Sequence, residues 1–400
     1  MKLEKATTKI SSLQLTNIFI CFLMNMLDGM DVMVVSYAAP SISSSWAVSP
    51  QSLGVVFSTG LLGMSIGAMF LAPRADKVGR KTMILFCNAL MGLSVFATSW
   101  VNSVEALMIL RVLSGIGIGG VLATTATLTA EYAPKSTKDF WVSCVMSGYP
   151  VGAVLSGLAA TSITPHYGWQ TMFKIAGFSS FLVIPIVYFF LKESEEFLQK
   201  ARAVKNPVVG ALLTSTFKKP TLWLWLAIFM AFASLYFLTT WIPKLASATG
   251  LSVELAIYAG TIFNLGAFCG IVSQGYLSAK FGLQKTIFWY LLITAILMLL
   301  FDFFNGSVLV LFLFGLLGFG IQGGFVGMYS LAARLYPVEI RATGVGWAVG
   351  AGRIGAIAGP MVGGLLIGIG MSMAANFIAF SIPTVIAGIA TLFIRTKETN

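Results

Sequence analysis

Two carboxylates stand inside the first long apolar segment of the chain, in the sequence Leu27-Asp28-Gly29-Met30-Asp31. The segment runs from about residue 16 to residue 40, so Asp28 lies near its middle. A carboxylate at the centre of a membrane helix costs about 2.5–3.5 kcal/mol. Residues three positions apart share one helix face, so both aspartates would face the same space. Either they form a polar contact that joins helices, or they bind a proton or a substrate; we favour the second interpretation.

A guanidinium lies at a similar depth in a later apolar segment. Arg353 stands about twelve residues into the segment 341–369, which places it near the centre of a bilayer. Its planar fork suits a carboxylate held by two hydrogen bonds. The alternative is a permanent ion pair with Asp28 or Asp31. Arg111, in the segment 105–131, lies nearer the outer side, where structural, gating and ligand-binding roles all remain open.

Other polar and aromatic side chains at similar depth could complete a binding site. Amides offer hydrogen bonds and aromatic rings can stack on a planar ligand. Each of these residues, taken alone, also fits ordinary helix packing. The candidates are Asn25, Asn264, Gln322, Tyr149, Tyr329 and Trp347.

The composition indicates that membrane-spanning helices carry these residues. Of the 400 residues, 57% are hydrophobic and only 10% are charged, whereas soluble domains carry about 25% charged residues. The apolar runs are continuous rather than alternating, which excludes lipid-embedded strands and predicts an all-α polytopic membrane protein. We expect twelve transmembrane helices, at 16–40, 51–73, 82–101, 105–131, 139–163, 170–191, 221–243, 252–279, 285–303, 307–333, 341–369 and 372–395.

The net charge of +11 follows from topology rather than from an acidic partner. If both termini are cytoplasmic, 21 of the 25 basic residues fall in inside loops or tails, the other four being Arg111, Lys174, Lys244 and Arg353. That asymmetry is the positive-inside pattern of membrane proteins. No nucleic acid is needed to explain it, so we expect the lipid bilayer as the surroundings and a monomer without an obligatory protein partner.

The sequence lacks the residue patterns that usually bind a metal or a cofactor. The four cysteines stand in apolar segments without short spacings, and the single histidine, His166, falls in an expected loop. We therefore predict no metal site. The glycine-rich stretches follow no strand and precede no phosphate-binding lysine, so no nucleotide cofactor is expected.

The two halves of the chain repeat each other. Gly79 and Gly282 follow the second and eighth segments, and Pro134 and Pro337 follow the fourth and tenth; each pair is separated by 203 residues. The longest polar interval divides the segments six and six. We predict six-helix bundles at 1–191 and 221–400 related by pseudo-twofold symmetry, joined by a cytoplasmic linker at 192–220. Parallel repeats of this kind place a substrate site between them at mid-membrane.

Ala75-Asp76-Lys77-Val78-Gly79-Arg80-Lys81 resembles the loop signature of the major facilitator superfamily, G-x-L-A-D-R-x-G-R-K, although Ala72 and Arg74 replace its first Gly and Leu. Arg111-Val112-Leu113-Ser114-Gly115 resembles the superfamily's motif in the fourth helix. The resemblance implies a twelve-helix transporter, not an enzyme, driven by an ion or substrate gradient. Its loop charges would form a latch between the bundles as they rock. The residues assigned to this latch are Asp76, Gly79, Arg80, Lys81, Arg111 and Glu131.

Three further motifs narrow the resemblance. Asp28-Gly29-x-Asp31, Trp241-Ile242-Pro243-Lys244 and Gly352-Arg353-x-Gly355 are similar to the aromatic acid:proton symporter branch, which imports benzoate-like acids and includes a muconate transporter. In that family the arginine of the eleventh helix is implicated in binding the substrate carboxylate, and we assign that role to Arg353. The implied function is proton-coupled uptake of a small aromatic acid or muconate-like diacid across a bacterial inner membrane, for aromatic catabolism.

Two alternatives remain. One is an exporter of amphipathic compounds, although the antiporter motif of the fifth helix is only half present in Gly148-Tyr149-Pro150-Val151-Gly152. The other is a membrane sensor that transports nothing, although the longest non-membrane interval is short for a signalling domain.

Asp28 is our first choice for the proton-coupling residue, with Asp31 facing the same cavity.

Overall fold

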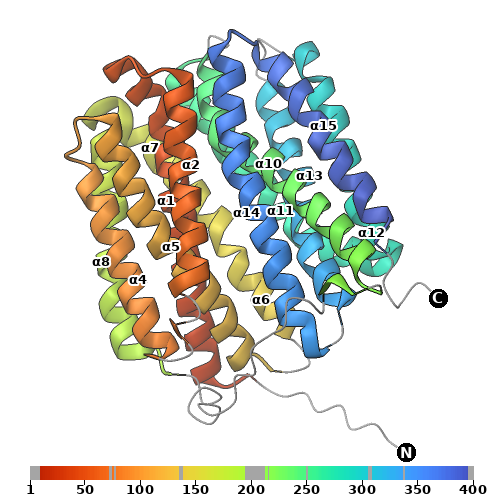
Figure 1. Cartoon of the computed structure of the whole chain (residues 1–400). Coiled ribbons are helices and arrows are strands. Elements are labelled where there is room, and N and C mark those ends of the chain that lie inside the picture. The colour runs from red at the N-terminus through yellow and green to blue at the C-terminus, as the bar shows by residue number, and fades with distance from the viewer. Residues whose placement is uncertain are drawn as a thin grey trace, which may run out of the picture.

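The structure is a computed structural model of the whole chain (Figure 1). It describes residues 10–71, 74–75, 78–134, 138–193, 212–214, 216–248, 251–304, 309–336 and 338–394. Within these ranges the regular structure is entirely helical, which confirms the predicted fold class. The predicted linker, 192–220, lies mostly outside the described residues, so the proposed domain boundaries stay a prediction.

The N-terminal half contains α1 (Ser12–Trp46), α2 (Pro50–Ile66), the π-helix η1 (Gly67–Leu71), α4 (Arg80–Thr98), α5 (Val104–Tyr132), α6 (Lys138–Met146), α7 (Gly148–Tyr167) and α8 (Trp169–Phe190). The C-terminal half contains α10 (Lys218–Ala248), α11 (Val253–Phe281), α12 (Leu283–Leu299), the 3-10 helix η3 (Phe301–Phe304), α13 (Leu309–Leu335), α14 (Val338–Gly368) and α15 (Met373–Leu392). Each of the twelve predicted segments holds a helix of the described chain, with α6 and α7 together filling one segment. Eleven helices among the described residues are long and apolar enough to cross a membrane.

Two segments differ from the prediction. The helix expected over 285–303 ends at Leu299, so α12 has 17 residues and is the shorter apolar helix. The helix expected over 139–163 is interrupted at Ser147, between α6 and α7. Pro150 explains the interruption, because it has no N–H to donate to the carbonyl of Met146 four residues earlier.

Glycines let neighbouring helices approach closely. A Cβ on Gly115 would collide with the carbonyl of Gly60, which fixes the contact of α5 with α2. Gly355 meets the carbonyl of Phe229 in the same way, where α14 packs on α10. This is the small-residue packing that membrane helices use. Gly346 and Gly350 differ, because a Cβ at either would have no atom within 4 Å.

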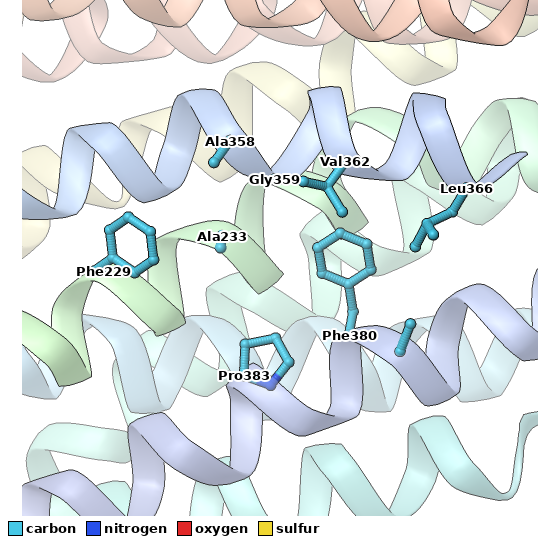
Figure 2. Close-up of a pocket in the computed structure, with 9 residues that line it drawn as sticks. Phe229, Ala233, Ala358, Gly359, Val362, Leu366, Phe380 and Pro383 are labelled. Atoms are coloured by element: carbon cyan, nitrogen blue, oxygen red, sulfur yellow. The ribbon is translucent and has the colours of Figure 1, made fainter. Parts of the chain in front are cut away.

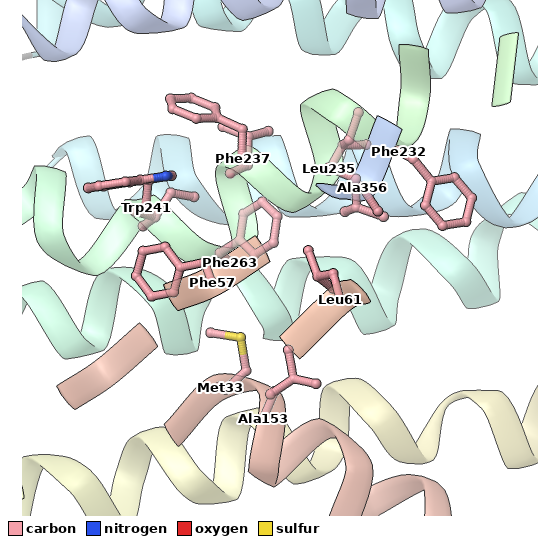
Figure 3. Packing of buried hydrophobic residues seen from close by; sticks show 14 of the residues in the cluster. Met33, Phe57, Leu61, Ala153, Phe232, Leu235, Phe237, Trp241, Phe263 and Ala356 are labelled. Carbon is pink, nitrogen blue, oxygen red and sulfur yellow. The ribbon is translucent and has the colours of Figure 1, made fainter. Parts of the chain in front are cut away.

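The two halves meet where α1 packs on α10, α2 on α14 and α7 on α11, and α1 also touches α11. The Ser58 hydroxyl of α2 donates to the carbonyl oxygen of Ile357 in α14 at 2.7 Å. The edge of Phe57 meets the ring of Trp241 with the centroids 5.2 Å apart. Figure 3 shows Phe57 and Met33 of the N-terminal half beside Trp241 and Phe263 of the C-terminal half, in one hydrophobic cluster.

These contacts lie towards the end of the bundle away from the termini, which share one end in Figure 1. The beginning of α1 belongs instead to a separate cluster, where Ile18 and Met24 pack with Ile84 and Leu128 of the same half. Gly346 and Gly350, in the first turns of α14, face open space. The contacts between the halves described above therefore lie at the far end, whereas Gly346 and Gly350 of α14 meet no packing partner.

Candidate functional site

Asp31 is paired, and its partner is Arg111 rather than Arg353. The Nη1 atom of Arg111 in α5 donates to Oδ1 of Asp31 in α1 at 3.2 Å, and both side chains are buried. The Ser114 side chain also interacts with Asp31. This is an intramembrane ion pair within the N-terminal half. From the sequence, an ion pair of Arg353 with Asp28 or Asp31 was the alternative to substrate binding. The structure pairs Asp31 with Arg111 instead.

Asp28 lies one helical turn earlier and is only 1% exposed. Its Oδ1 atom is buried without a hydrogen-bond partner. Among the described residues no Lys, Arg or His nitrogen lies within 4.0 Å of its carboxylate. The charges that act on Asp28 are those of Asp31, Arg353 and Arg111. The two aspartates therefore share a helix face but not an environment, because only Asp31 has a cation in contact.

Arg353 projects from α14 towards the N-terminal half and is 7% exposed. Its Nη1 atom lies 4.0 Å from the sulfur of Met64 in α2, and its guanidinium lies 5.9 Å from the ring centre of Phe232 in α10. Its Nε atom is buried without an acceptor. In the described part of the chain no carboxylate forms an ion pair with it. A buried guanidinium without an anion is costly in a membrane, so this site favours an anionic ligand.

Three tyrosines from three helices are influenced by this charge. Tyr149 of α7, Tyr236 of α10 and Tyr329 of α13 all interact electrostatically with Arg353. Tyr149 and Tyr236 also interact with Asp28. The sequence predicted Tyr149 and Tyr329 but missed Tyr236. The missed residue lies in an apolar stretch, Ala233-Ser234-Leu235-Tyr236-Phe237, in which no spacing marks a site.

The predicted amides are buried, and two of them have a free acceptor. Asn25 donates to the hydroxyl of Thr125 at 3.1 Å, and Asn264 donates to the carbonyl of Gly260 at 2.9 Å. The Oδ1 atoms of both are buried without a donor. Asn264 also interacts with the hydroxyl of Tyr37, at the contact of α11 with α1. Gln322 is buried in α13.

Trp347 is separated from the site. It is 47% exposed and stacks on Trp225 with the ring centroids 5.9 Å apart. Trp347 precedes Arg353 by six residues, which at about 100° per residue turns it to another face of α14. Depth along a helix, which the sequence gives, does not determine which face a residue occupies.

The loop charges of the superfamily motif join helices of one half. Arg80 pairs with Glu131 of α5 at 3.0 Å, and the backbone N–H groups of Arg80 and Lys81 donate to the carboxylate of Glu193 at 2.9 and 3.2 Å. Gly79, with φ of 100°, has no side chain to cap α4, so the carboxylate of Glu193 takes that place. Asp76 lies outside the described residues, so its role as a latch between the bundles stays a prediction.

A pocket elsewhere in the C-terminal half has none of these features. It has a volume of about 280 Å³ and lies between α10, α14 and α15. Figure 2 shows that apolar side chains line it, among them Phe229, Val362 and Phe380. It offers no charge and no hydrogen-bonding side chain, so we place the functional site at Arg353 and Asp28 instead.

The family profile of the Major Facilitator Superfamily matches residues 21–274 and 243–400. The fold agrees with solved transporter structures. A crystal structure of a D-xylose-proton symporter has a TM-score of 0.80 and 19% identity, covering 96% of this chain and 97% of that one. A partially occluded inward-open conformation of the xylose transporter XylE from E. coli has a TM-score of 0.77 and 18% identity, covering 98% of this chain and 100% of that one. The chain is a multi-pass membrane transporter rather than an enzyme, and it requires no cofactor.

Its curated relatives specify the branch. The chain is 31% identical to the 4-hydroxybenzoate transporter PcaK of Pseudomonas aeruginosa, over 96% of this chain and 93% of the relative. It is 31% identical to the 3-(3-hydroxy-phenyl)propionate transporter of Escherichia coli, over 100% and 98%. It is 30% identical to the benzoate transport protein of Acinetobacter baylyi, over 92% and 86%. The chain belongs to the major facilitator superfamily, in the family of the aromatic acid transporters.

Proposed function

We propose that this protein imports an aromatic or muconate-like carboxylic acid together with a proton. One observation carries the proposal: Arg353 and Asp28, from opposite halves, are both buried without an ion-pair partner among the described residues. A guanidinium without an anion is ready for a carboxylate, and a carboxylate without a cation is ready for a proton. The names of the relatives, which carry benzoate or hydroxylated aromatic acids, support the substrate class.

The two sites would be coupled through the charge of Arg353. In the empty carrier this charge acts on Asp28. A substrate carboxylate bound to Arg353 would neutralise that charge and favour the protonated form of Asp28. Binding of the acid and of the proton would then strengthen each other, which is the linkage that symport requires. Asp31 takes less part in this scheme, because Arg111 remains beside it in the same half.

The orientation follows from the charge asymmetry of the loops. We propose a bacterial inner membrane with both termini in the cytoplasm and a carrier that works as a monomer. The far end, where the halves are packed together, would then be closed towards the outside. Rocking of the halves around Arg353 and Asp28 would open that end.

Uptake into proteoliposomes tests this function. Labelled benzoate, 4-hydroxybenzoate and cis,cis-muconate would be offered with and without an imposed pH gradient, acidic outside. We expect accumulation of at least one acid that depends on the gradient and collapses with a protonophore. Gradient-driven loss of preloaded acid, without uptake, would support an exporter. Failure to bind or move any of the acids would refute the proposal.

A further inference from the structure

Tyr37 of α1 lies where helices of both halves meet. Its side chain is 1% exposed, and its hydroxyl donates to the carbonyl oxygen of Ala153 in α7 at 3.1 Å. These two helices both belong to the N-terminal half. The ring also reaches the surface on which the two halves touch, which we call the seam, where it lies against Gly260 of α11. One side chain therefore combines a hydrogen bond within its own half with a packing contact across the seam.

Glycines on both sides leave room for the ring of Tyr37. A Cβ on Gly260 would lie 2.7 Å from Cε1 of Tyr37 and 3.0 Å from Cγ of Pro243 in α10. A Cβ on Gly157 of α7 would lie 3.1 Å from Cζ of Tyr37 and would collide with the hydroxyl of Thr261 in α11. The ring thus fills a slot between Gly157 and Gly260, which come from opposite halves. A close-packed interior has no space for a further methyl group there.

The slot lies between Asp28 and the far end of the bundle. Tyr37 follows Asp28 by nine residues, which places it about 13 Å farther along α1 from the N-terminus. Gly260 lies near the beginning of α11, seven residues after Val253. Tyr37 also belongs to the hydrophobic cluster that joins the two halves. Its ring therefore fills the seam on the side of Asp28 that faces the far end.

We propose that Tyr37 is a positioning residue whose ring, seated between Gly157 and Gly260, holds the far end closed. When that end opens, α11 must leave the ring. The hydrogen bond to Ala153 keeps the ring on α7, so Tyr37 moves with the N-terminal half. Closure then depends on the fit of the ring against Gly260. This inference goes beyond the proposed function and holds whichever acid is carried.

The slot differs from the polar contacts across the seam. Ser58 donates a hydrogen bond to the carbonyl oxygen of Ile357, and such a bond can lengthen slightly when the helices shift. A ring between two glycines has less tolerance, because one added methyl group would occupy the space that the ring fills. The closed far end should therefore be sensitive to a single methyl group at Gly260.

The experiment compares Gly260→Ala with the matched control Gly275→Ala in the full-length protein. Gly275 lies in the same helix, but it is exposed and a Cβ there would have no atom within 4 Å. The reporter is a cysteine at Ala256, which is 0% exposed and lies one turn before Gly260. The four native cysteines are replaced by alanine, and the rate of modification by a water-soluble maleimide is measured in nanodiscs. Both membrane faces are accessible there, so the result does not depend on orientation.

The expected results differ between the two glycines. In Gly260→Ala the cysteine should react about tenfold faster than in the wild type, as expected from overpacking one buried contact. In Gly275→Ala it should react within about twofold of the wild-type rate, as for a surface substitution. Unfolding midpoints within about 4 °C of the wild type would verify folding of both variants.

Substitutions of Tyr37 identify the ring as the group that matters. Tyr37→Ala should itself speed modification of the reporter, because no ring then fills the slot, whereas Tyr37→Phe keeps the ring and should change the rate by at most about threefold. In the Tyr37→Ala background, adding Gly260→Ala should change the rate by less than about twofold, because the two substitutions remove the same contact. Should Gly260→Ala not fold, the comparison of Tyr37→Ala with Tyr37→Phe still tests the inference.

Three outcomes would overturn the inference. One is a wild-type rate in Gly260→Ala, the second is an equal rate in Tyr37→Ala and Tyr37→Phe, and the third is a full effect of Gly260→Ala in the absence of the Tyr37 ring. None of them bears on which acid is bound or on proton coupling, so the proposed function would stand or fall separately in the uptake experiment.

Discussion

The hydroxyl of Ser36 in α1 donates to the carbonyl oxygen of Thr239 in α10, 203 residues later, at 3.1 Å. The same hydroxyl lies 2.6 Å from the carbonyl of Thr240. The separation equals that of the internal repeat, so the two residues are equivalent positions in the two halves. Pro40 and Pro243 are also 203 positions apart. Because Pro243 has no N–H, the carbonyl of Thr239 lacks its helical donor, and Ser36 supplies one across the seam.

Ser36→Ala should weaken the closed far end of the bundle. Hydrogen bonds between membrane helices contribute about 0.6 kcal/mol on average, so we expect about a threefold shift towards the conformation that opens there. The measurement is the rate at which a thiol reagent modifies a cysteine placed at Leu61. This residue lies buried in the hydrophobic cluster that joins the two halves. Ser44→Ala is the control, because Ser44 bonds only to Ser41 on its own helix. Equal rates in the two variants would mean that Ser36 does not hold the seam.

Asp28→Asn should abolish substrate accumulation driven by the pH gradient but spare exchange of substrate across the membrane. The amide imitates a carboxylic acid that always carries its proton, so the carrier can still rock with substrate bound. Accumulation driven by a pH gradient should fall to the level without a gradient. Counterflow of labelled against unlabelled substrate should retain at least half of the wild-type rate. Accumulation at the wild-type level in Asp28→Asn would remove this residue from proton coupling.

Asp31→Asn should act mainly on stability. Removing one partner of a buried ion pair leaves the other charge uncompensated and costs about 3–5 kcal/mol. The expected result is a clear fall in the midpoint of thermal unfolding in detergent. Replacing both partners, as Asp31→Asn with Arg111→Leu, should recover most of the loss, because no buried charge is then left unpaired. If the single and double variants unfold alike, the pair does not stabilise the fold.

The sequence predicted the helices well because the length of each continuous apolar run indicates the length of the membrane helix. It could not predict where a helix is cut, since the break at Ser147 depends on one proline, or where it stops short, as α12 does at Leu299. It predicted Asp28, Asp31 and Arg353 because ionisable residues in apolar segments are costly and therefore conspicuous. The pairing of Asp31 with Arg111 depends on how α1 and α5 cross, which is a property of packing and not of spacing along the chain.

Residues without an unusual environment in the sequence were the hardest to find. Tyr236 is one aromatic residue among several in α10, and only its electrostatic interaction with both Arg353 and Asp28 distinguishes it. Glu193 resembles the other charges of the linker, yet its carboxylate caps α4 from more than a hundred residues away. Trp347 was selected by depth, and it stacks on Trp225 on a different face of α14 from Arg353. Long-range contacts of this kind depend on three-dimensional placement that no local pattern encodes.

Glu193→Gln should loosen the start of α4. The amide keeps an acceptor for the N–H groups of Arg80 and Lys81 but loses the charge that favours a helix N-terminus, a loss of about 0.3–1 kcal/mol. Hydrogen exchange of the first turn of α4 should rise severalfold while α5 stays unchanged. Lys192→Gln is the control, because it alters the neighbouring charge and leaves the cap in place.

The arginine prediction tests the anion site most directly. Arg353→Lys preserves the charge but removes the planar pair of donors that a carboxylate can accept in two-point contact. The lysine side chain is also shorter, so its ammonium group would lie farther from Phe232 and Met64, which flank the guanidinium in the wild type. We therefore expect Arg353→Lys to bind labelled benzoate at least tenfold more weakly than the wild type, nearly as weakly as Arg353→Ala. Calorimetry or scintillation proximity binding at pH 5.5 would measure this, with unfolding midpoints as the check on folding. Binding by Arg353→Lys within twofold of the wild type would show that the site needs only a positive charge, and the two-point recognition of the substrate carboxylate would be wrong.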